Sequence, residues 1–431
     1  MFITKDHTMT WFDLSFENGT QARYDNETNR ITDMDGNDLL DKNPSPPDFK
    51  VAPIVSPDAP VKKSKAPRTL KISMGLKCNY SCSYCNQAIH VGDSSHTNID
   101  DVSDFMNRLD DWLEGEPEQV EIWGGEPWLY WKKIQVLLPE LRKRFPKTEF
   151  LTITNGSLFN QTIYDLIVEY DITVVISHDA MGQHLRGPDP LLDDEKREWI
   201  DKVIANRAPS GKFCFNSVMC AGNHNPQAIK DYFYREFGPE VRSDFEGIVN
   251  DYSDGEIGLV REFTVSEYLQ LQDYILQGFY DGSLRDVSYF GGRYNNFLED
   301  LYNRKPSYSV GQKCGMDRPE ELAVDLQGNA MTCQNTGANG SHYIGNVYED
   351  NVELDTSWHW SHRKECASCP VLHLCKGSCM YLEGDNWSRS CNNEYYTAMP
   401  IFIAAMSDLA GSRLLTIEGQ VIRPDYQIPT G

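Results

Sequence analysis

The sequence predicts a fold of the α/β class, a parallel sheet covered by helices, and three observations point to it. Strand-like and helix-like runs alternate in about six units between residues 68 and 300. A small β-rich segment at residues 1–43 and a proline-rich linker at 44–67 precede them. A cysteine-rich region at 310–400 follows, and residues 401–431 are expected to form a closing helix and tail.

Composition and charge narrow the class of protein. The chain has 431 residues and a formal net charge of −24, so nucleic acid is not an expected partner, because phosphate backbones attract Lys and Arg. No run of about 18 apolar residues is present, and no membrane-spanning helix is expected. No secretory signal is visible, so we expect a cytoplasmic location. Twelve cysteines in such a chain favour metal binding or catalysis over disulfides.

The N-terminal elements are predicted from turn and proline signals. Residues 11–25 alternate in polarity on both sides of Asn18-Gly19, which predicts a β-hairpin. The proline density of the linker favours an extended segment rather than a packed element.

The βα units follow in order. Strands are expected at residues 68–76, 119–126, 149–156, 171–179, 212–219 and 245–251. Helices are expected after Asn98, a possible N-cap, and near residues 131–145, 160–169, 194–206, 226–236 and 264–279. The unusual residues lie where strands end: MGLKC, GGEP, TNG and SHDA. Parallel βα folds place their chemistry at those carboxyl ends.

Three cysteines come directly after the first of these strands. Cys78, Cys82 and Cys85 are spaced C-x3-C-x2-C. Thiolates favour zinc, copper(I) and iron–sulfur clusters, and three of them can hold three corners of a four-iron four-sulfur cluster. The fourth iron is then open to a substrate or cofactor. The alternatives are a zinc site whose fourth ligand lies elsewhere, for instance His90, and a reactive cysteine without metal.

The surrounding motifs make the comparison specific. CNYSCSYC resembles the radical S-adenosylmethionine (radical SAM) signature C-x3-C-x-aromatic-C, with Tyr84 in the aromatic place. The GGEP motif of that family is matched by residues 124–127, and Asn155, Ser177 and Asp179 match its later strand-end positions. The resemblance covers about residues 68–400. It implies a partial (β/α)6 TIM-like barrel.

The same resemblance implies the cofactor contacts. The amino and carboxylate groups of S-adenosylmethionine would chelate the open iron, and a 5′-deoxyadenosyl radical would abstract hydrogen from the substrate. The implied cofactor-binding residues are Tyr84, Gly124, Gly125, Glu126, Asn155, Ser177, Asp179 and Arg186. Glu126 would meet the ammonium group, and Ser177 and Asp179 the carboxylate or ribose. Arg186 is otherwise an ordinary solvated arginine, and Asn155 a turn residue.

The later cysteines closely resemble a SPASM extension, which usually holds two auxiliary four-iron four-sulfur clusters. By that resemblance the outer cluster is ligated by Cys366, Cys369, Cys375 and Cys391, and the inner cluster by Cys314, Cys333 and Cys379. The inner cluster is then one thiolate short. Either Asp317 fills the place or the position is open to substrate, which we favour. Structural zinc is the alternative for this region. Cys214 and Cys220 are expected to be packing residues.

SPASM enzymes differ in the reaction they catalyse. Those that convert a cysteine or serine of sulfatases to formylglycine usually carry an aspartate base after the G-x4-C cysteine, where this chain has Gln334. Glutamine cannot accept a proton at neutral pH. We therefore expect a peptide-modifying enzyme that installs an intramolecular carbon–carbon or thioether crosslink in a ribosomally made precursor. The alternatives are formylglycine formation, small-molecule dehydrogenation, and a zinc-stabilised binding protein without turnover.

The expected partners are a precursor peptide and an electron donor such as flavodoxin or ferredoxin. Many peptide-modifying members begin with a winged-helix segment, and residues 1–43 are short for that module. Leader recognition therefore falls to a reduced element, a separate protein or the barrel itself.

Overall fold

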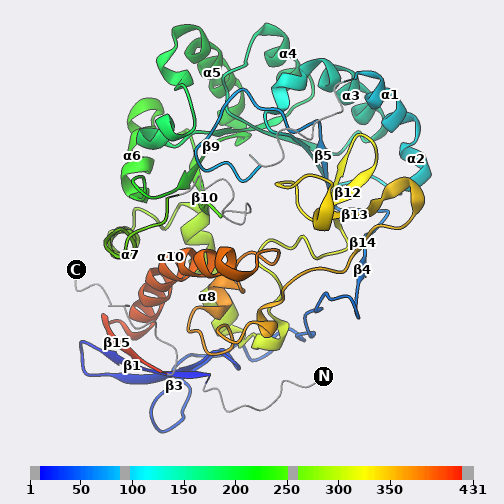
Figure 1. Ribbon diagram of the computed structural model, residues 1–431. Helices are drawn as coiled ribbons and strands as arrows, with labels where there is room; N and C mark the ends of the chain where they lie inside the picture. The colour runs from blue at the N-terminus through cyan, green and yellow to red at the C-terminus, as the bar shows by residue number, and fades with distance from the viewer. Residues whose placement is uncertain (1–9, 88–97, 251–260, 420–431) are drawn as a thin grey trace.

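The computed structural model describes residues 10–87, 98–250 and 261–419. Its centre is one nine-stranded sheet in the order β10-β9-β8-β7-β6-β5-β11-β12-β13 (Figure 1). The first six βα strands are β5 (Thr69–Ser73), β6 (Gln119–Trp123), β7 (Glu149–Thr154), β8 (Thr173–Ser177), β9 (Phe213–Met219) and β10 (Ser243–Ile248). Each is parallel to its neighbour, and β10 forms one open edge among the described strands.

The sheet continues beyond the expected six strands into the cysteine-rich region. β11 (Glu321–Asp325) pairs in parallel with β5, and β12 (Asn329–Met331) and β13 (Tyr343–Asn346) follow antiparallel. The boundary expected near residues 300–310 therefore does not separate two sheets. This continuity brings residues after 310 next to the strand that precedes the first cysteine group.

Helices cover the outer face of the parallel strands (Figure 1). They are α1 (Asp100–Asn107), α2 (Leu109–Trp112), α3 (Trp131–Arg144), α4 (Gln161–Glu169), α5 (Asp194–Arg207), α6 (Pro226–Phe237) and α7 (Val265–Tyr280). In α3 the side chains of Ile134, Leu137, Leu138 and Leu141 are fully buried at helical spacing. Ile99 rather than Asn98 is the N-cap of α1.

The sheet formed by the N-terminal β segment includes a strand from the C-terminal part of the chain. This four-stranded sheet has the order β15-β1-β2-β3, with β1 (Trp11–Phe16), β2 (Gln21–Asp25), β3 (Arg30–Thr32) and β15 (Leu414–Glu418). The Asn18-Gly19 hairpin is present, and Gly19 has a φ of 84°, which glycine adopts without steric cost. The expected C-terminal tail thus begins as a strand of this sheet.

One long helix connects this small sheet to the rest of the molecule. α10 (Gly384–Ala410) crosses the boundary expected at residue 400 and lies between the N-terminal sheet and α7 (Figure 1). The fully buried ring of Phe402 lies 5.3 Å from that of Tyr24 and 5.8 Å from that of Phe297 in α8 (Arg293–Tyr302). Nothing in the sequence pattern predicted α8.

The proline-rich linker is extended but partly packed. β4 (Val61–Lys62) pairs with β14 (Glu353–Leu354). Lys63 is buried, and its ammonium group donates to the carbonyl oxygens of Met316 at 2.6 Å and Arg318 at 2.9 Å. The expectation of an unpacked linker is therefore wrong for this part. Lys63 can be buried because the two carbonyl oxygens satisfy the donors of its ammonium group.

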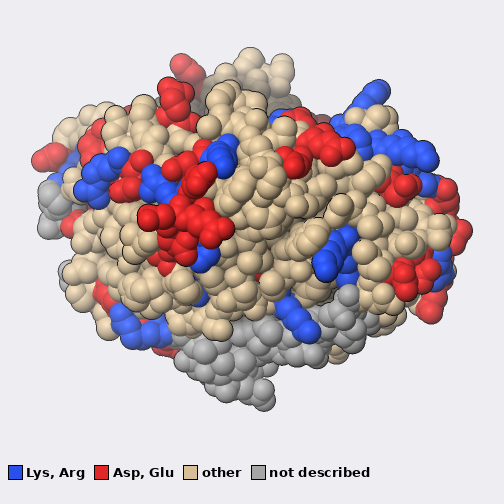
Figure 2. Space-filling view, turned by 90° about the horizontal axis from the view of Figure 1, so that it is seen from above, with Lys and Arg blue, Asp and Glu red and all other residues tan. Residues whose placement is uncertain are grey.

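Acidic and basic side chains are interspersed on the face shown in Figure 2. Among the described helices, none is long and apolar enough to cross a membrane.

Candidate active site at the carboxyl ends of the strands

A cavity of about 490 Å³ opens at the carboxyl ends of the parallel strands. Two groups of three cysteines line it. The first group is Cys78, Cys82 and Cys85 after β5, and the second is Cys314, Cys333 and Cys379 from the cysteine-rich region. Folding therefore brings both cysteine groups, far apart in the sequence, to the walls of a single cavity.

The loop that carries the first cysteine group is fixed by polar side chains of neighbouring strand ends. Asn155, after β7, donates to Asn79 Oδ1 at 2.9 Å and accepts from Ser157. Asn79 donates to Ser157 Oγ at 2.8 Å. Asn155 thus positions the cysteine loop as well as lining the cavity. The backbone N–H of Tyr80 donates to Cys78 Sγ at 3.4 Å, a contact that also tunes thiolates bound to iron.

The two glycines of GGEP are required by the backbone of this loop. A Cβ on Gly124 would lie 2.7 Å from the carbonyl oxygen of Gly75, and one on Gly125 would lie 2.4 Å from that of Leu76. The Gly125 N–H donates to Gly75 O at 3.1 Å. The glycines therefore allow the strand ends of β5 and β6 to approach.

Glu126 is fully surrounded by protein and lines the cavity. Its carboxylate accepts from Thr154 Oγ1 at 2.7 Å, Asn155 N at 2.8 Å and Trp128 N at 3.1 Å. Burial raises the pKa of Glu126, and these hydrogen bonds oppose the shift. The carboxylate is thus held rigidly, with oxygen lone pairs remaining for a ligand.

Tyr84, Asp179 and Arg186 form one contact group. The Tyr84 hydroxyl donates to Asp179 and accepts from Arg186 Nη1 at 3.0 Å. Asp179 is fully buried, accepts from Val218 N at 3.0 Å and lies outside the cavity lining. Burial raises the pKa of Asp179 to about 6, with Arg186 opposing. Tyr84, Arg186 and Ser177 do line the cavity, so Arg186 is not an ordinary solvated arginine.

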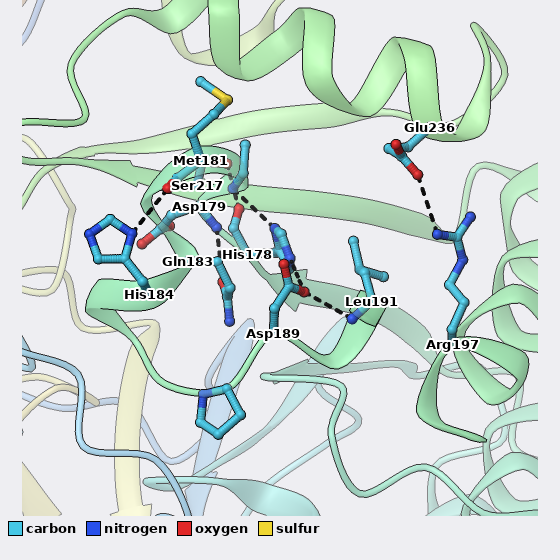
Figure 3. Close-up of polar contacts among 12 residues, drawn as sticks. His178, Asp179, Met181, Gln183, His184, Asp189, Leu191, Arg197, Ser217 and Glu236 are labelled. Carbon is cyan, nitrogen blue, oxygen red and sulfur yellow. Dashed lines mark hydrogen bonds and ion pairs between the residues drawn. The ribbon is translucent and has the colours of Figure 1, made fainter. Parts of the chain in front are cut away.

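His178, between Ser177 and Asp179, anchors the segment after β8 (Figure 3). Its ring is fully buried, with Nε2 3.0 Å from Asp189 Oδ1 and Nδ1 accepting from the Ala180 N–H at 3.0 Å. Burial lowers the pKa of His178. The neighbouring Pro188 carbonyl accepts from the Tyr80 hydroxyl at 2.7 Å, so this anchor also supports the cysteine loop.

Within each trio, burial and the neighbouring thiols act together on the pKa of a cysteine. Burial raises the pKa of Cys78 to about 12, and Glu126, Cys82 and Cys85 add to the rise. Burial raises the pKa of Cys333 to about 12, with Cys314 and Cys379 adding. Such thiols become thiolates when a metal compensates their charge, so the donor set fits an iron–sulfur cluster.

The other four cysteines of the SPASM-like region form a separate group. Burial raises the pKa of Cys366, and Cys375, Cys369 and Cys391 add to the rise. The N-terminal sheet supports this group, since Asn26 Nδ2 donates to the carbonyl oxygens of Ala367 at 3.1 Å and Cys369 at 2.8 Å.

The remaining sequence candidates among the described residues lie away from the cavity, with one exception. Asp317 is buried and does not line the cavity, but its charge reaches Cys314. Gln334 does line it. Cys214 and Cys220 lie outside both thiol trios and outside the lining. His90 lies outside the described residues. No three His, Cys, Asp or Glu among the described residues could hold a single metal ion; cysteines of a cubic cluster each bind a different iron.

Sequence reasoning missed three charged residues that line the cavity. Glu246 comes from β10, Lys71 from β5, and Lys313 precedes Cys314. Their signal was weak because charged residues in short strands are usually solvated.

The open parallel sheet thus carries, at its carboxyl edge, a three-cysteine loop that lines a cavity, an arrangement that fits an iron–sulfur cluster beside a bound ligand. Residues 72–208 match the Radical SAM superfamily. This part of the chain is a radical SAM domain, and the resemblance seen in its motifs is confirmed. The superfamily uses S-adenosylmethionine and a four-iron four-sulfur cluster.

Individual relatives are distant. The radical SAM cyclopropyl synthase TigE of Paramaledivibacter caminithermalis is 21% identical over 339 residues, covering 73% of this chain and 68% of that protein. Native anSMEcpe with bound AdoMet and Cp18Cys peptide has a TM-score of 0.56 and 18% identity, covering 80% of this chain and 98% of that one. Streptococcus suis SuiB has a TM-score of 0.46 and 16% identity, covering 73% of each chain. The likeness to the anSMEcpe structure confirms the α/β fold, and the described sheet is open at β10, as expected of a partial barrel.

Gly125→Ala is expected to remove the iron of the first cluster. The new methyl group would meet the Leu76 and Lys77 carbonyl oxygens at 2.4 and 2.6 Å, and relief requires movement of the backbone that leads into Cys78. Iron and sulfide content with the visible spectrum, measured after anaerobic reconstitution, checks this. Gly292→Ala is the control, because nothing lies within 4 Å of its Cβ position. Equal iron in both variants would contradict the expectation.

Proposed function

We propose that this enzyme cleaves S-adenosylmethionine reductively and uses the 5′-deoxyadenosyl radical to install an intramolecular crosslink in a ribosomally made precursor peptide. The observation that carries the proposal is the cavity shared by the two cysteine trios. A substrate between them would face the radical source on one side and a second redox group on the other.

The cavity residues suit the cofactor in named roles. We infer that Cys78, Cys82 and Cys85 bind the first cluster, and that Glu126 holds the ammonium group of S-adenosylmethionine. Ser177 and Arg186, which line the cavity, would meet its carboxylate, and Tyr84 would border the adenine. Asp179 acts through Tyr84 and Arg186, since it contacts both.

Two auxiliary clusters are part of the proposal. Cys366, Cys369, Cys375 and Cys391 would bind the outer one, and Cys314, Cys333 and Cys379 the inner one. The backbone N–H of Asn335 donates to Cys333 Sγ at 3.4 Å, as at the first trio. Because the inner trio faces the cavity while Asp317 does not, an open fourth position is favoured over Asp317 ligation.

One solved structure supports a peptide substrate, since anSMEcpe was solved with a peptide bound. The name of TigE describes formation of a cyclopropyl group, which supports a ring-closing reaction. Formylglycine formation is disfavoured at Gln334, but Glu246 gives the cavity another carboxylate, so that reaction remains the second candidate.

The test is turnover by the anaerobically reconstituted protein with a reductant, S-adenosylmethionine and any short peptide found to be encoded beside its gene. We expect 5′-deoxyadenosine and a peptide lighter by two hydrogen atoms per crosslink. The product should resist fragmentation between the joined residues and be unreactive towards aldehyde reagents. An aldehyde product would establish the second candidate instead. Zinc in place of iron and no 5′-deoxyadenosine would establish a binding protein.

Adding peptide to the same preparation tests whether the inner cluster has an open fourth ligand position. The magnetic signal of that cluster should change on peptide addition if its fourth position is open. An unchanged signal would indicate that Asp317 occupies it.

A further inference from the structure

Glu246 is a carboxylate of the cavity that the proposed cofactor contacts leave unused. It lines the cavity from β10 and is exposed there. Its carboxylate makes no hydrogen bond or ion pair that involves the described part of the chain. The carboxylate is therefore open to the cavity and free to contact a molecule bound there.

The backbone directs this side chain into the cavity by a bulge. The pairing of β10 with β9 shifts register between Phe245 and Gly247, which leaves Glu246 as the extra residue. Bulges re-aim side chains beside active sites. Gly247 has a φ of 110°, and a Cβ there would lie 2.7 Å from the Tyr289 hydroxyl. The bulge is therefore built into the packing around it.

The cations nearest Glu246 in the cavity already have carboxylate partners. Lys71 pairs with Glu121 at 3.0 Å, Lys313 pairs with Glu394, and Arg186 lies 3.5 Å from Asp179. Their charges favour the ionised form of Glu246 without a direct contact. Although the side chain faces the open cavity, the surrounding protein excludes part of its hydration, and this desolvation raises the pKa of Glu246. A carboxylate with a raised pKa is a stronger proton acceptor.

We propose that Glu246 is the catalytic residue that accepts the substrate proton. This inference rests on the proposed function. Joining a C–H carbon to a second X–H atom, where X is carbon or sulfur, breaks both bonds to hydrogen and forms one C–X bond. One hydrogen atom leaves to the 5′-deoxyadenosyl radical. The second leaves as a proton to Glu246, and its electron leaves to an oxidised iron–sulfur cluster, the class of acceptor suited to the inner cysteine trio.

The test is Glu246→Gln, which keeps the size of the side chain and removes the proton acceptor. With a peptide deuterated at the reacting carbon, the variant should still transfer deuterium into 5′-deoxyadenosine. Crosslinked product should fall by about 100-fold or more. Iron content and peptide affinity should match those of the wild type. Glu246→Asp should restore part of the product, and Glu262→Gln, at an exposed ion pair with Arg389, should be unaffected.

The outcomes separate the two proposals. Equal product from Glu246→Gln and wild type would overturn the role of Glu246 and leave the crosslinking function standing. An aldehyde product from the wild type that disappears in Glu246→Gln would overturn crosslinking and support the role of Glu246. Loss of deuterium transfer together with product would place Glu246 in cofactor binding and overturn its role as proton acceptor.

Discussion

Replacing Cys78, Cys82 and Cys85 together by alanine is expected to abolish formation of 5′-deoxyadenosine. These thiols share the loop after β5, and their side chains line one end of the cavity. Without them the described residues of that loop offer no thiolate to the proposed cluster that supplies the electron to S-adenosylmethionine. We expect product at the level of the protein-free control, measured by chromatography after anaerobic incubation with S-adenosylmethionine and a reductant.

The matched control is Cys214→Ala. Cys214 lies in β9, its Sγ contacts the Phe215 carbonyl oxygen at 3.1 Å, and it does not line the cavity. This variant should retain 5′-deoxyadenosine formation and the iron content of the wild type. Full 5′-deoxyadenosine formation by the triple variant would mean that this loop does not bind the catalytic cluster.

Cys391→Ser is expected to abolish modification of the peptide while leaving the first cluster in place. Cys391 is contributed by α10, and it completes the outer group with three cysteines of the preceding loop. That loop leads directly into Cys379 of the inner trio. Loss of the outer cluster should therefore displace a wall of the cavity. Mass spectrometry of the peptide should show no crosslink, while 5′-deoxyadenosine forms slowly without coupling to product.

Ser388→Ala on the same helix is the control, because Ser388 is exposed and its hydroxyl contacts only the Gly384 carbonyl oxygen in the described structure. Iron analysis should show a loss confined to Cys391→Ser. A crosslinked peptide from Cys391→Ser with its outer iron absent would show that the outer cluster is dispensable.

The local sequence predicted the βα core well. All six expected strands are present within a few residues of their predicted ends, as are the helices that follow them. Each of these elements buries its own stripe of apolar residues, as Ile134 and Leu141 of α3 illustrate, and such stripes are visible in the local pattern. The first cysteine trio could be recognised for a similar reason, since ligand spacing within a loop is a local property, whereas the grouping of the later cysteines rested on a family resemblance.

Contacts between segments that are distant in the sequence could not be predicted from the local sequence pattern. β15 joins the N-terminal hairpin, β11 extends the parallel sheet, and Asn26 holds the backbone of Cys369. Glu246 looked like an ordinary charge in a weak strand until the bulge against β9 turned it into the cavity.

The sequence by itself determined the superfamily, the cysteine loop and the order of the βα units, because spacing and periodicity act over a few residues. Only the tertiary structure decided that two cysteine trios face one cavity, that Asp179 is withdrawn behind Tyr84, and that Glu246 is left unpaired there. These features depend on contacts between side chains that are far apart in the sequence. The interaction free energies of such contacts are set by burial and distance in the folded structure rather than by neighbours in the chain.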